Sequence, residues 1–448
     1  MTGFPEYSRF FVFGMARSGI AVSMLLAKDG KRVAVSDDDS AALERFGVSD
    51  SAQAAEIIPR AHAEEAAAQS QCVVVSPGVP LDHPVIVRAQ RAGVPVIGEV
   101  EAAYRYTRAR IVGVTGTNGK STTVGVIGGI LKSGGVDTVV AGNVGTPLAD
   151  VLRERDPATL VLELSSFQLD TIDRFRVDVA VLLNVTPDHL DRYHHSFDEY
   201  AASKGRILNR AAAGTYYVYN AEDEIAVALA GTHRGPSIPF SSRRALEEGV
   251  FFENDSLVRV WQGRRDVVIR RSEFTPVGVH NLENALASIG AVIPFGISLD
   301  AVRAALRAYH PLPHRMELVR VVDGVAYIND SKATNVDATA KSLASIDGPV
   351  IVILGGRDKE GDFTALLPHL KSTRRAVLIG EAKDVIARAL KGRVEMAQAS
   401  DMRDAVRAAR ASARPGDTVL LAPACASFDM FKNYQERGEV FRATVNAL

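Results

Sequence analysis

The sequence predicts an α/β protein built from three domains. Short apolar runs alternate with helical patterns along most of the chain, which is typical of parallel sheets covered by helices on both faces. The chain has 448 residues, which is too many for one ordinary hydrophobic core and favours roughly two to four domains. An extended segment around Pro311, where two prolines exclude a helix, separates the last part of the chain. We therefore predict domains at 1–103, 104–311 and 312–448.

The composition excludes several classes of partner. The 52 Lys and Arg residues nearly balance the 53 Asp and Glu residues, so no overall field favours nucleic acid or an anionic membrane. Cys72 and Cys425 lie in apolar surroundings, which indicates buried thiols and a reducing compartment. Residues 1–9 lack a signal-like pattern, and no uninterrupted apolar run reaches about 18 residues. We expect a cytoplasmic protein with small-molecule partners and no membrane insertion.

The first domain is predicted to have a Rossmann-like fold. Asp37 and its acidic neighbours follow the second strand, where such folds place a carboxylate against a ribose. Ala16 stands where the glycine fingerprint has its middle glycine, and its methyl group obstructs a pyrophosphate, so a bound dinucleotide is disfavoured. The expected elements are a strand at Arg9–Phe13, a turn at Gly14–Gly19, a helix at Ile20–Lys28 and strands at Arg32–Ser36, Cys72–Val75 and Val94–Ile97.

The middle domain is organised around a phosphate loop (P-loop). An apolar run from Ile111 breaks into Gly116 and Gly119 and ends in Lys120 and Ser121, and an apolar helix follows. Glycines allow successive backbone N–H groups to face one anion, the lysine adds a positive charge, and the serine offers a hydroxyl to magnesium. This predicts a nucleoside triphosphate as partner, although an ordinary strand-to-helix corner has a similar pattern.

Two more strands of the middle domain end in polar residues. Glu163 lies near the end of the strand Leu160–Leu164, and His189 follows the strand Val179–Leu183. A buried carboxylate needs a metal or a cation, or else it caps a helix. His189 is either a ligand or a loop histidine exposed to water. Because the carboxyl ends of parallel strands share one edge, both residues should lie beside the phosphate loop.

The remainder of the middle domain has weaker signals. Lys204 lies in a helical pattern, and the residues alone predict a lysine exposed to solvent. Asn281 and Asn284 share one face of a helix start, where they either cap the helix or hydrogen-bond a nucleobase or a phosphate. The expected strands are Thr138–Ala141 and, towards the far edge, Tyr216–Tyr219, Val250–Phe252 and Val267–Arg271, and the expected helix opens at Val279–Leu286.

The third domain repeats the strand–helix rhythm, and its polar turns are its main functional signal. Turns at Asp330–Asn335, Gly355–Lys359 and Pro423–Phe428 each follow a strand, so three polar loops should converge on one edge of the sheet. Arg315 is either a phosphate clamp or an ordinary surface arginine. The expected strands, a Rossmann-like set, are Val325–Ile328, Val350–Leu354, Ala376–Ile379 and Thr418–Leu421.

In combination, these motifs resemble those of the Mur ligases of peptidoglycan precursor synthesis, in the same order through all three domains. The matching segments are Gly116–Thr122, Glu163–Leu169, Asn184–Tyr193, His280–Ala285, Pro313–Arg315, Asn329–Asn335 and Pro423–Asp429. The resemblance implies an ATP-dependent ligase that adds D-glutamate to UDP-N-acetylmuramoyl-L-alanine through an acyl phosphate. It also implies two magnesium ions, a closing motion about a hinge at 304–315, and a monomer.

The resemblance further implies roles for individual residues. Contacts to the UDP substrate fall to Arg17, Ser18, Asp37, Asn143, Ser165 and Gln168. ATP would be bound by Gly116, Thr117, Asn118, Gly119, Lys120, Ser121, Thr122, Asn281, Asn284, Arg315 and Asp330. Magnesium would be held by Ser121, Glu163, His189 and Lys204, the lysine as a carbamate formed with CO2. D-Glutamate would be received by Lys332, Thr334, Lys359, Ser427 and Tyr434, and the catalytic set would be Lys120, Asn143, His189, Lys204 and Lys332.

Three other interpretations stay open at the level of sequence. A folylpolyglutamate-type ligase would share the phosphate loop but take a pterin. A nicotinamide-dependent oxidoreductase would use Gly14–Gly19 but leaves the Lys120 loop unexplained. A nucleotide-binding regulatory protein would bind ATP without releasing ADP. Within the resemblance, Arg357 departs from the family pattern, because an acidic residue is expected at that position.

Overall fold

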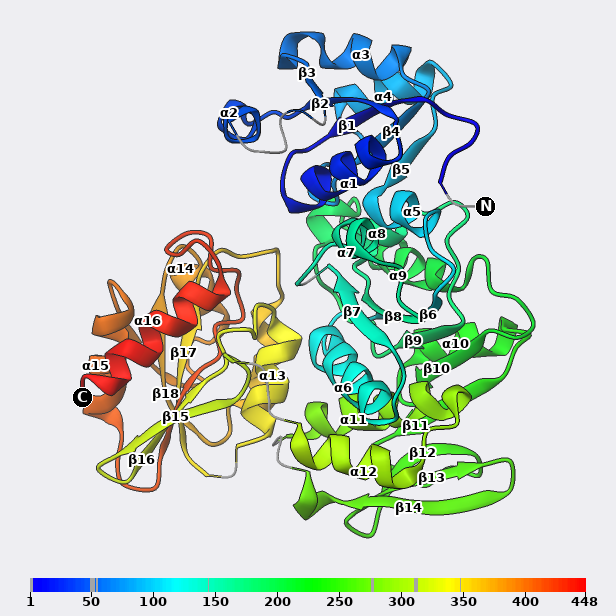
Figure 1. The fold of residues 1–448 in the computed structure, drawn as a ribbon. Helices are drawn as coiled ribbons and strands as arrows, with labels where there is room; N and C mark the ends of the chain where they lie inside the picture. The colour runs from blue at the N-terminus through cyan, green and yellow to red at the C-terminus, as the bar shows by residue number, and fades with distance from the viewer. Residues whose placement is uncertain are drawn as a thin grey trace.

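The computed structural model contains three separate sheets and describes residues 3–48, 53, 55–143, 145–274, 278–309, 313–346 and 348–448. Figure 1 shows the first sheet at the top in blue, the second in cyan to green below it, and the third in yellow to red beside the second. Within the described residues, no helix is both long and apolar enough to cross a membrane. The predicted α/β fold is confirmed. The predicted linker residues Pro311 and Leu312 lie outside the described residues, and the three domain boundaries stay predictions.

The first sheet has five parallel strands in the order β3-β2-β1-β4-β5. The predicted strands are confirmed, with the last one displaced towards Gly98. The two-residue β3 has too little apolar pattern to be seen in the sequence. The elements are β1 (Arg9–Phe13), α1 (Arg17–Lys28), β2 (Arg32–Ser36), α2 (Ser40–Gly47), β3 (Glu56–Ile57), η2 (Arg60–His62), α3 (Ala63–Gln69), β4 (Cys72–Val75), α4 (Pro84–Arg91), β5 (Val96–Gly98) and α5 (Glu99–Tyr104).

The second sheet has nine strands in the order β14-β13-β12-β11-β10-β9-β6-β8-β7. Strands β6 to β11 are parallel to their neighbours, whereas β12 to β14 form antiparallel hairpins at the far edge of the sheet, where short strands were expected. The strands are β6 (Arg110–Thr115), β7 (Thr138–Gly142), β8 (Thr159–Glu163), β9 (Val179–Leu182), β10 (Tyr216–Asn220), β11 (Ser237–Ser241), β12 (Gly249–Glu253), β13 (Ser256–Trp261) and β14 (Arg264–Arg270).

Helices cover both faces of this sheet. They are α6 (Lys120–Ser133), α7 (Leu148–Glu154), α8 (Ser166–Leu169), η3 (Leu190–Arg192), α9 (Phe197–Gly205), η4 (Arg206–Leu208), α10 (Glu224–Thr232), η5 (Arg271–Glu273), α11 (Val279–Val292), η6 (Ile293–Phe295) and α12 (Leu299–Ala308). One buried core runs from Phe4 to Ala226 and joins the first sheet to the second through α1, α5 and α7. The first two domains therefore share apolar packing.

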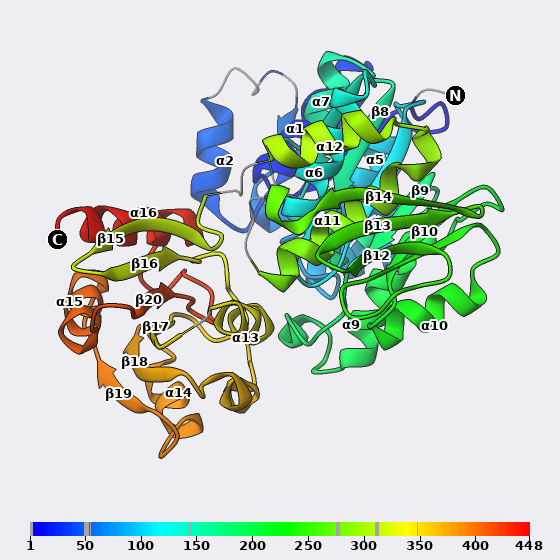
Figure 2. The ribbon, with the colours of Figure 1, turned by 90° about the horizontal axis from the view of Figure 1, so that it is seen from below.

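The third sheet has six strands in the order β15-β16-β20-β17-β18-β19, with β15 antiparallel. Its two cores contain only residues from Met316 onward, so its apolar packing is its own. Helix α13 faces the middle domain in both views (Figures 1 and 2). The elements are β15 (Glu317–Val322), β16 (Val325–Asn329), α13 (Val336–Ala344), β17 (Val350–Gly355), η7 (Phe363–His369), β18 (Thr373–Ile379), α14 (Lys383–Ala389), β19 (Glu395–Gln398), α15 (Met402–Ser412), β20 (Thr418–Leu421) and α16 (Tyr434–Asn446).

Candidate active site

The phosphate loop joins β6 to α6 at the carboxyl edge of the middle sheet. Gly119 precedes α6 with φ of 92°, a conformation that L side chains rarely adopt, and a Cβ there would meet the Oδ1 of Asn284 at 2.3 Å. The Nζ of Lys120 donates to the carbonyls of Gly116, at 2.7 Å, and Thr117, at 2.9 Å. The ammonium therefore rests inside the loop, beside the first N–H groups of a long helix, where an anion is favoured.

Two asparagines fix the loop to the neighbouring strand. The backbone N–H of Asn118 donates to the Oδ1 of Asn184 at 2.9 Å, and the Nδ2 of Asn184 donates back to the carbonyl of Asn118 at 3.1 Å. Asn184 follows β9, which pairs with β6. The loop is thus held from the adjacent strand end, as the shared sheet edge predicted.

Glu163 ends β8 and is 2% exposed. Its Oε1 accepts a hydrogen bond from the Nδ2 of Asn143 at 3.1 Å, and its buried Oε2 has no hydrogen-bond partner among the described residues. It does not cap the following helix, because Ser165 and Gln168 form that capping box. An unpaired buried carboxylate oxygen close to a phosphate loop fits a hard cation such as magnesium.

No group of three or more His, Cys, Asp or Glu side chains gathers as a metal site within the described ranges. Magnesium suits such a sparse site, because it keeps several waters and is bound through one or two carboxylates together with substrate phosphates. Glu163 and the hydroxyl of Ser121 are oxygen donors of this kind.

Lys204 is buried, so the prediction from residues alone, a lysine exposed to solvent, is wrong. It lies on α9 with 2% exposure, its Nζ donates to the carbonyl of Gly116 at 3.0 Å, and the ammonium lies 4.5 Å from the ring centroid of Tyr200. Burial, followed by repulsion from Lys120, holds the pKa of Lys204 well below its usual value. The packing of α9 against the phosphate loop buries Lys204, and the helical pattern of the sequence gives no sign of this burial.

His189 lies in the same region, on the loop after β9. Its backbone has φ of 54°, and its ring meets that of Phe167 edge-on with centroids 5.2 Å apart. Desolvation lowers the pKa of His189 to about 4, against the opposing charge of Asp188. A neutral imidazole at neutral pH has the protonation state that a metal ligand needs. The side chain is 40% exposed, so the imidazole is also in contact with water.

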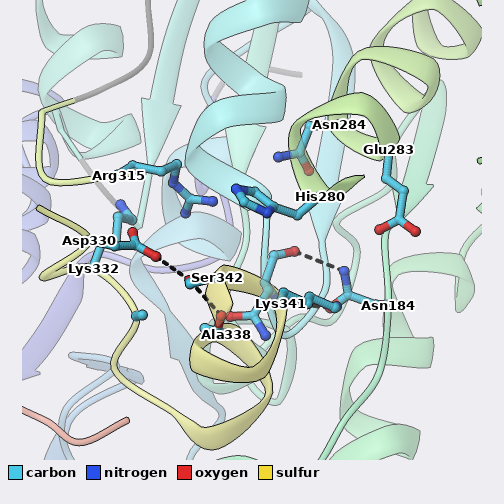
Figure 3. A pocket seen from close by; sticks show the side chains of 13 residues that line it. Asn184, His280, Glu283, Asn284, Arg315, Asp330, Lys332, Ala338, Lys341 and Ser342 are labelled. Atoms are coloured by element: carbon cyan, nitrogen blue, oxygen red, sulfur yellow. Dashed lines mark hydrogen bonds between the residues drawn. The ribbon is translucent and has the colours of Figure 1, made fainter. Parts of the chain in front are cut away.

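A cavity opens between the phosphate loop, the start of α11 and the first loop of the third domain (Figure 3). Three buried polar atoms facing this region have no hydrogen-bond partner among the described residues: the Nδ1 of His280, the Nδ2 of Asn284 and the Nε of Arg315. Gly278 is the N-cap of α11, so neither Asn281 nor Asn284 is the N-cap residue. The lining residues are Asn118, Gly119, Asn184, His280, Glu283, Asn284, Arg315, Asp330, Lys332, Ala333, Ala338, Lys341 and Ser342.

The cavity wall includes residues that the sequence analysis had not singled out. Burial raises the pKa of Glu283 and lowers that of His280 to about 3. Arg315 is half-buried and lines the cavity, so it is not an ordinary surface arginine. Asp330 accepts hydrogen bonds from Ser342 and from the backbone of Met316. His280 and Glu283 each precede one of the predicted residues, Asn281 and Asn284, on the same helix. Their positions in the sequence could therefore have indicated that they line the same cavity.

Polar contacts join the third domain to the middle domain at this point. The Nζ of Lys332 lies 3.0 Å from the Oγ of Ser121, and the Nδ2 of Asn118 donates to the Oδ2 of Asp337 at 2.7 Å. Lys359 forms an ion pair with Asp188 at 2.7 Å. Attraction to Lys359 helps to lower the pKa of Asp188 to about 2, although burial opposes this.

The three predicted turns of the third domain do converge. They follow β16, β17 and β20, which are adjacent in the sheet. Lys332 reaches to within 3.3 Å of the Oη of Tyr434. Ser427 is buried and Thr334 half-buried, whereas Lys359 is directed at Asp188. Arg357, the departure from the family pattern, is exposed and pairs with Glu381 at 3.3 Å.

The residues predicted for the UDP substrate are more scattered. Asp37 accepts hydrogen bonds from the N–H groups of Met15 and Asp39, while Arg17 is exposed and Ser18 half-buried at the start of α1. A second cavity lies between the first and middle domains and is lined by residues such as Ser76, Phe167 and Arg192, but by none of the six predicted residues.

Comparison with known proteins covers the whole chain. Residues 8–98, 114–292 and 314–425 match the family models described as Mur ligase MurD-like N-terminal domain, Mur ligase middle domain and Mur ligase, glutamate ligase domain. A relative from Pelotomaculum thermopropionicum, named UDP-N-acetylmuramoylalanine--D-glutamate ligase, is 43% identical over 445 residues, which is 98% of each chain.

Two solved structures share the fold. A pseudomurein peptide ligase type C from Methanothermus fervidus aligns with a TM-score of 0.63 at 19% identity, over 98% of this chain and 99% of its own. The UDP-N-acetylmuramate-alanine ligase MurC from Thermotoga maritima aligns with a TM-score of 0.61 at 18% identity, over 99% of this chain and 100% of its own. At these identities the likeness concerns the fold alone.

Proposed function

The chain belongs to the Mur ligase family, and we propose that it is the ATP-dependent enzyme that joins D-glutamate to UDP-N-acetylmuramoyl-L-alanine in peptidoglycan precursor synthesis. The full-length relative with that name and the MurD-like model of the first domain support this choice of substrates. The observation that carries the proposal is the meeting of the phosphate loop with the polar turns of the third domain, through Lys332 and Ser121.

ATP would bind at the phosphate loop, with its nucleoside towards the cavity of Figure 3. Lys120 and the N-terminus of α6 suit the phosphates, and Asn281, Asn284, Arg315 and Asp330 suit the nucleoside side. The Nδ2 of Asn284 and the Nε of Arg315, which have no hydrogen-bond partner in the described ranges, support this, because buried donors without a partner are costly and point to a ligand.

Magnesium would be held by Glu163 and Ser121, and its chemistry there would be to neutralise charge on the transferred phosphoryl group. His189 and Lys204 would serve a second magnesium ion. A carbamate is the form in which a lysine offers oxygen to a hard cation. The lowered pKa of Lys204 favours the neutral amine, which is the form that adds CO2.

The reaction follows from the weakness of a carboxylate as an electrophile. The alanyl carboxylate of the UDP substrate attacks the γ-phosphorus of ATP, ADP leaves, and an acyl phosphate forms. The amine of D-glutamate then attacks the acyl carbon, and the tetrahedral intermediate expels inorganic phosphate and loses a proton. Lys120 and Lys332 would stabilise negative charge on the transferring oxygens.

Water must be excluded while the acyl phosphate exists, and the third domain is suited to this. Within the described part of the chain it shares no buried apolar core with the middle domain, so closure would exchange mainly polar contacts such as Lys359 with Asp188. We place the hinge at 304–315, of which 310–312 lie outside the described residues. A cytoplasmic monomer with the predicted domain boundaries is part of the same proposal.

The decisive experiment measures ADP release by the purified protein. It should require UDP-N-acetylmuramoyl-L-alanine and D-glutamate together, with L-glutamate, L-lysine and meso-diaminopimelate as inactive controls. Failure to bind a uridine nucleotide would favour a folylpolyglutamate-type ligase. ATP binding without ADP release in the presence of both substrates would favour a regulatory protein.

A further inference from the structure

A buried arginine lies beneath the three loops of the third domain. Arg437, on α16, is 1% exposed and is the largest of the fully buried side chains. An arginine in an amphipathic helix is usually exposed to solvent, and the helical pattern gives no sign that Arg437 is buried. Its burial is therefore a result of tertiary structure alone.

The guanidinium nitrogens of Arg437 donate hydrogen bonds to two of these loops, the Asp330–Asn335 loop and the Pro423–Phe428 loop. The Nε donates to the Oγ of Ser331 at 3.0 Å, and the Nη2 donates to the carbonyl of Ser331 at 2.8 Å. The Nη1 donates to the carbonyls of Cys425, at 3.1 Å, and Ala426, at 3.3 Å. One guanidinium thus bridges the loop that carries Lys332 and Thr334 to the loop that carries Ser427.

Arg437 forms no ion pair within the described parts of the chain. Burial lowers its pKa to about 10, so the guanidinium stays charged at neutral pH. Burying a charge whose partners are only carbonyl and hydroxyl oxygens costs free energy. Such a residue is expected where the position of its hydrogen bonds is needed for function. An apolar side chain of similar volume under the loops would give an equal or higher free energy of unfolding, so stability alone does not explain an arginine at this position.

The loops around Arg437 are tightly connected to each other. The hydroxyl of Ser331 accepts from Arg437 and donates to the carbonyl of Tyr434 at 2.8 Å. This chain of hydrogen bonds, the relay, therefore runs from Arg437 to a residue predicted to receive D-glutamate. Arg357 and Ala426 exchange two backbone hydrogen bonds, which adds the third loop. Ala424 is held at φ of 61°, a conformation that costs energy for a residue with a Cβ and persists where the surroundings over-determine it.

From this arrangement we infer that Arg437 is a positioning residue for D-glutamate, which sets the distance between the Lys332–Thr334 loop and the Ser427 loop. The inference rests on the proposed function. D-Glutamate carries two carboxylates and an amine, so its recognition needs polar groups from more than one loop. Its affinity then depends on the spacing that the guanidinium fork fixes.

The fork geometry explains why lysine is a poor substitute. An ammonium is a single point of charge, whereas the planar guanidinium directs donors at two loops simultaneously. Arg437→Lys keeps the charge and loses the bridge, and Arg437→Met loses both. Arg442, on the same helix, forms its ion pairs within the described residues with Glu317 at 2.8 Å and Glu439 at 3.2 Å, neither of which lies in these loops. Arg442→Lys is therefore a matched control.

The test measures steady-state KM values for D-glutamate and ATP with saturating UDP-N-acetylmuramoyl-L-alanine. We expect the KM for D-glutamate to rise about tenfold in Arg437→Lys and about a hundredfold in Arg437→Met, as the loss of charged hydrogen bonds implies. The KM for ATP should rise less than the KM for D-glutamate, because the phosphate loop, Asn281 and Asn284 lie on the middle domain and only Arg315 and Asp330 of the proposed ATP-binding residues belong to the third. Arg442→Lys should change neither value.

A purely structural role gives a different result. It would lower the melting temperature and the active fraction, and hence kcat, while the KM for D-glutamate of the remaining enzyme stayed unchanged, and that outcome overturns the inference. If Arg437→Met does not fold, Ser331→Ala decides, since it removes only the relay hydroxyl and should raise the same KM about threefold. If wild type shows no dependence on D-glutamate, the proposed function itself fails.

Discussion

The Nζ of Lys332 in the third domain lies 3.0 Å from the Oγ of Ser121 in the phosphate loop of the middle domain. The two residues are 211 positions apart, and among the described residues their domains have separate buried apolar cores. Burial, together with repulsion from Arg315, lowers the pKa of Lys332 to about 8. The third domain therefore places an amine beside the hydroxyl proposed to hold magnesium, and the proposed domain closure would be linked to the chemistry.

Replacement of Lys120 should abolish the reaction. Lys120→Ala removes the charge inside the phosphate loop, and we expect ADP release to fall at least a thousandfold, an order of magnitude typical of lost phosphoryl-transfer contacts. Lys132→Ala, at the exposed end of the same helix, should have near-normal activity. Normal turnover of Lys120→Ala would contradict the assignment of the loop.

Lys204→Ala should lose most activity and partly recover it when short carboxylic acids are added, because these can occupy the position of a carbamate. Wild-type activity should also fall when CO2 is removed from the buffers and return with bicarbonate. Indifference of both proteins to these additions would remove the carbamate from the proposal and leave Lys204 as a buried structural lysine.

Glu163→Gln should weaken the response to magnesium. The amide keeps the hydrogen bond from Asn143 but replaces the unpaired anionic oxygen, so the magnesium concentration for half-maximal ADP release should rise about tenfold or more. Manganese binding in the presence of ATP provides a readout independent of turnover. Glu154→Gln, exposed at the end of α7, is the control, and equal magnesium curves for the two variants would refute the site.

Alanine substitutions at two glycines, one in the phosphate loop and one on the following helix, should change the stability in opposite directions, through backbone strain at the first and helix propensity at the second. In Gly119→Ala the new Cβ would lie 2.3 Å from the Oδ1 of Asn284 at a positive φ, so we expect a loss of about 1–3 kcal/mol in the free energy of unfolding and weaker ATP binding. Gly129→Ala, in open space on α6, should instead stabilise by about 0.5–1 kcal/mol. Chemical denaturation and ATP titration measure both effects. Equal stabilities would show that the loop conformation is not as described.

Glu99 should make stability depend on pH. It is 2% exposed, its Oε1 accepts from the backbone of Ala149 at 2.7 Å, and burial raises its pKa from 4.5 to about 7. Between these values the folded protein keeps a proton that the unfolded chain has released. The free energy of unfolding should therefore fall as pH rises from about 4.5 to about 7, by up to an order of 3 kcal/mol.

Denaturation of wild type and Glu99→Gln across that range tests the assignment. The variant should lose this contribution to the pH dependence, since glutamine does not titrate, while the exposed Glu44→Gln should retain it. Parallel curves for wild type and Glu99→Gln would locate the titrating group elsewhere.

The chain by itself determined most of the strands, although not β3, β11, β13, β15 and β19, and it also determined the phosphate loop and the convergence of the three turns. These features depend on local patterns of residues. The apolar runs at Arg9–Phe13 and Thr418–Leu421, for example, form strands with the predicted bounds. The turns converge because the carboxyl ends of parallel strands lie at a common edge of the sheet. Glu163 and Asn284 could be selected for the same reason, because each lies within a recognisable element.

Only the tertiary structure decided which polar side chains are buried and which partners they meet. Lys204 and Arg437 look like solvated residues of ordinary helices, and Lys359 gives no sign that it pairs with Asp188. Burial depends on what packs over a residue from distant parts of the chain, and a helix pattern contains no information about the covering segment. The charges that this protein places out of water are therefore a property of the assembled domains and not of any local stretch.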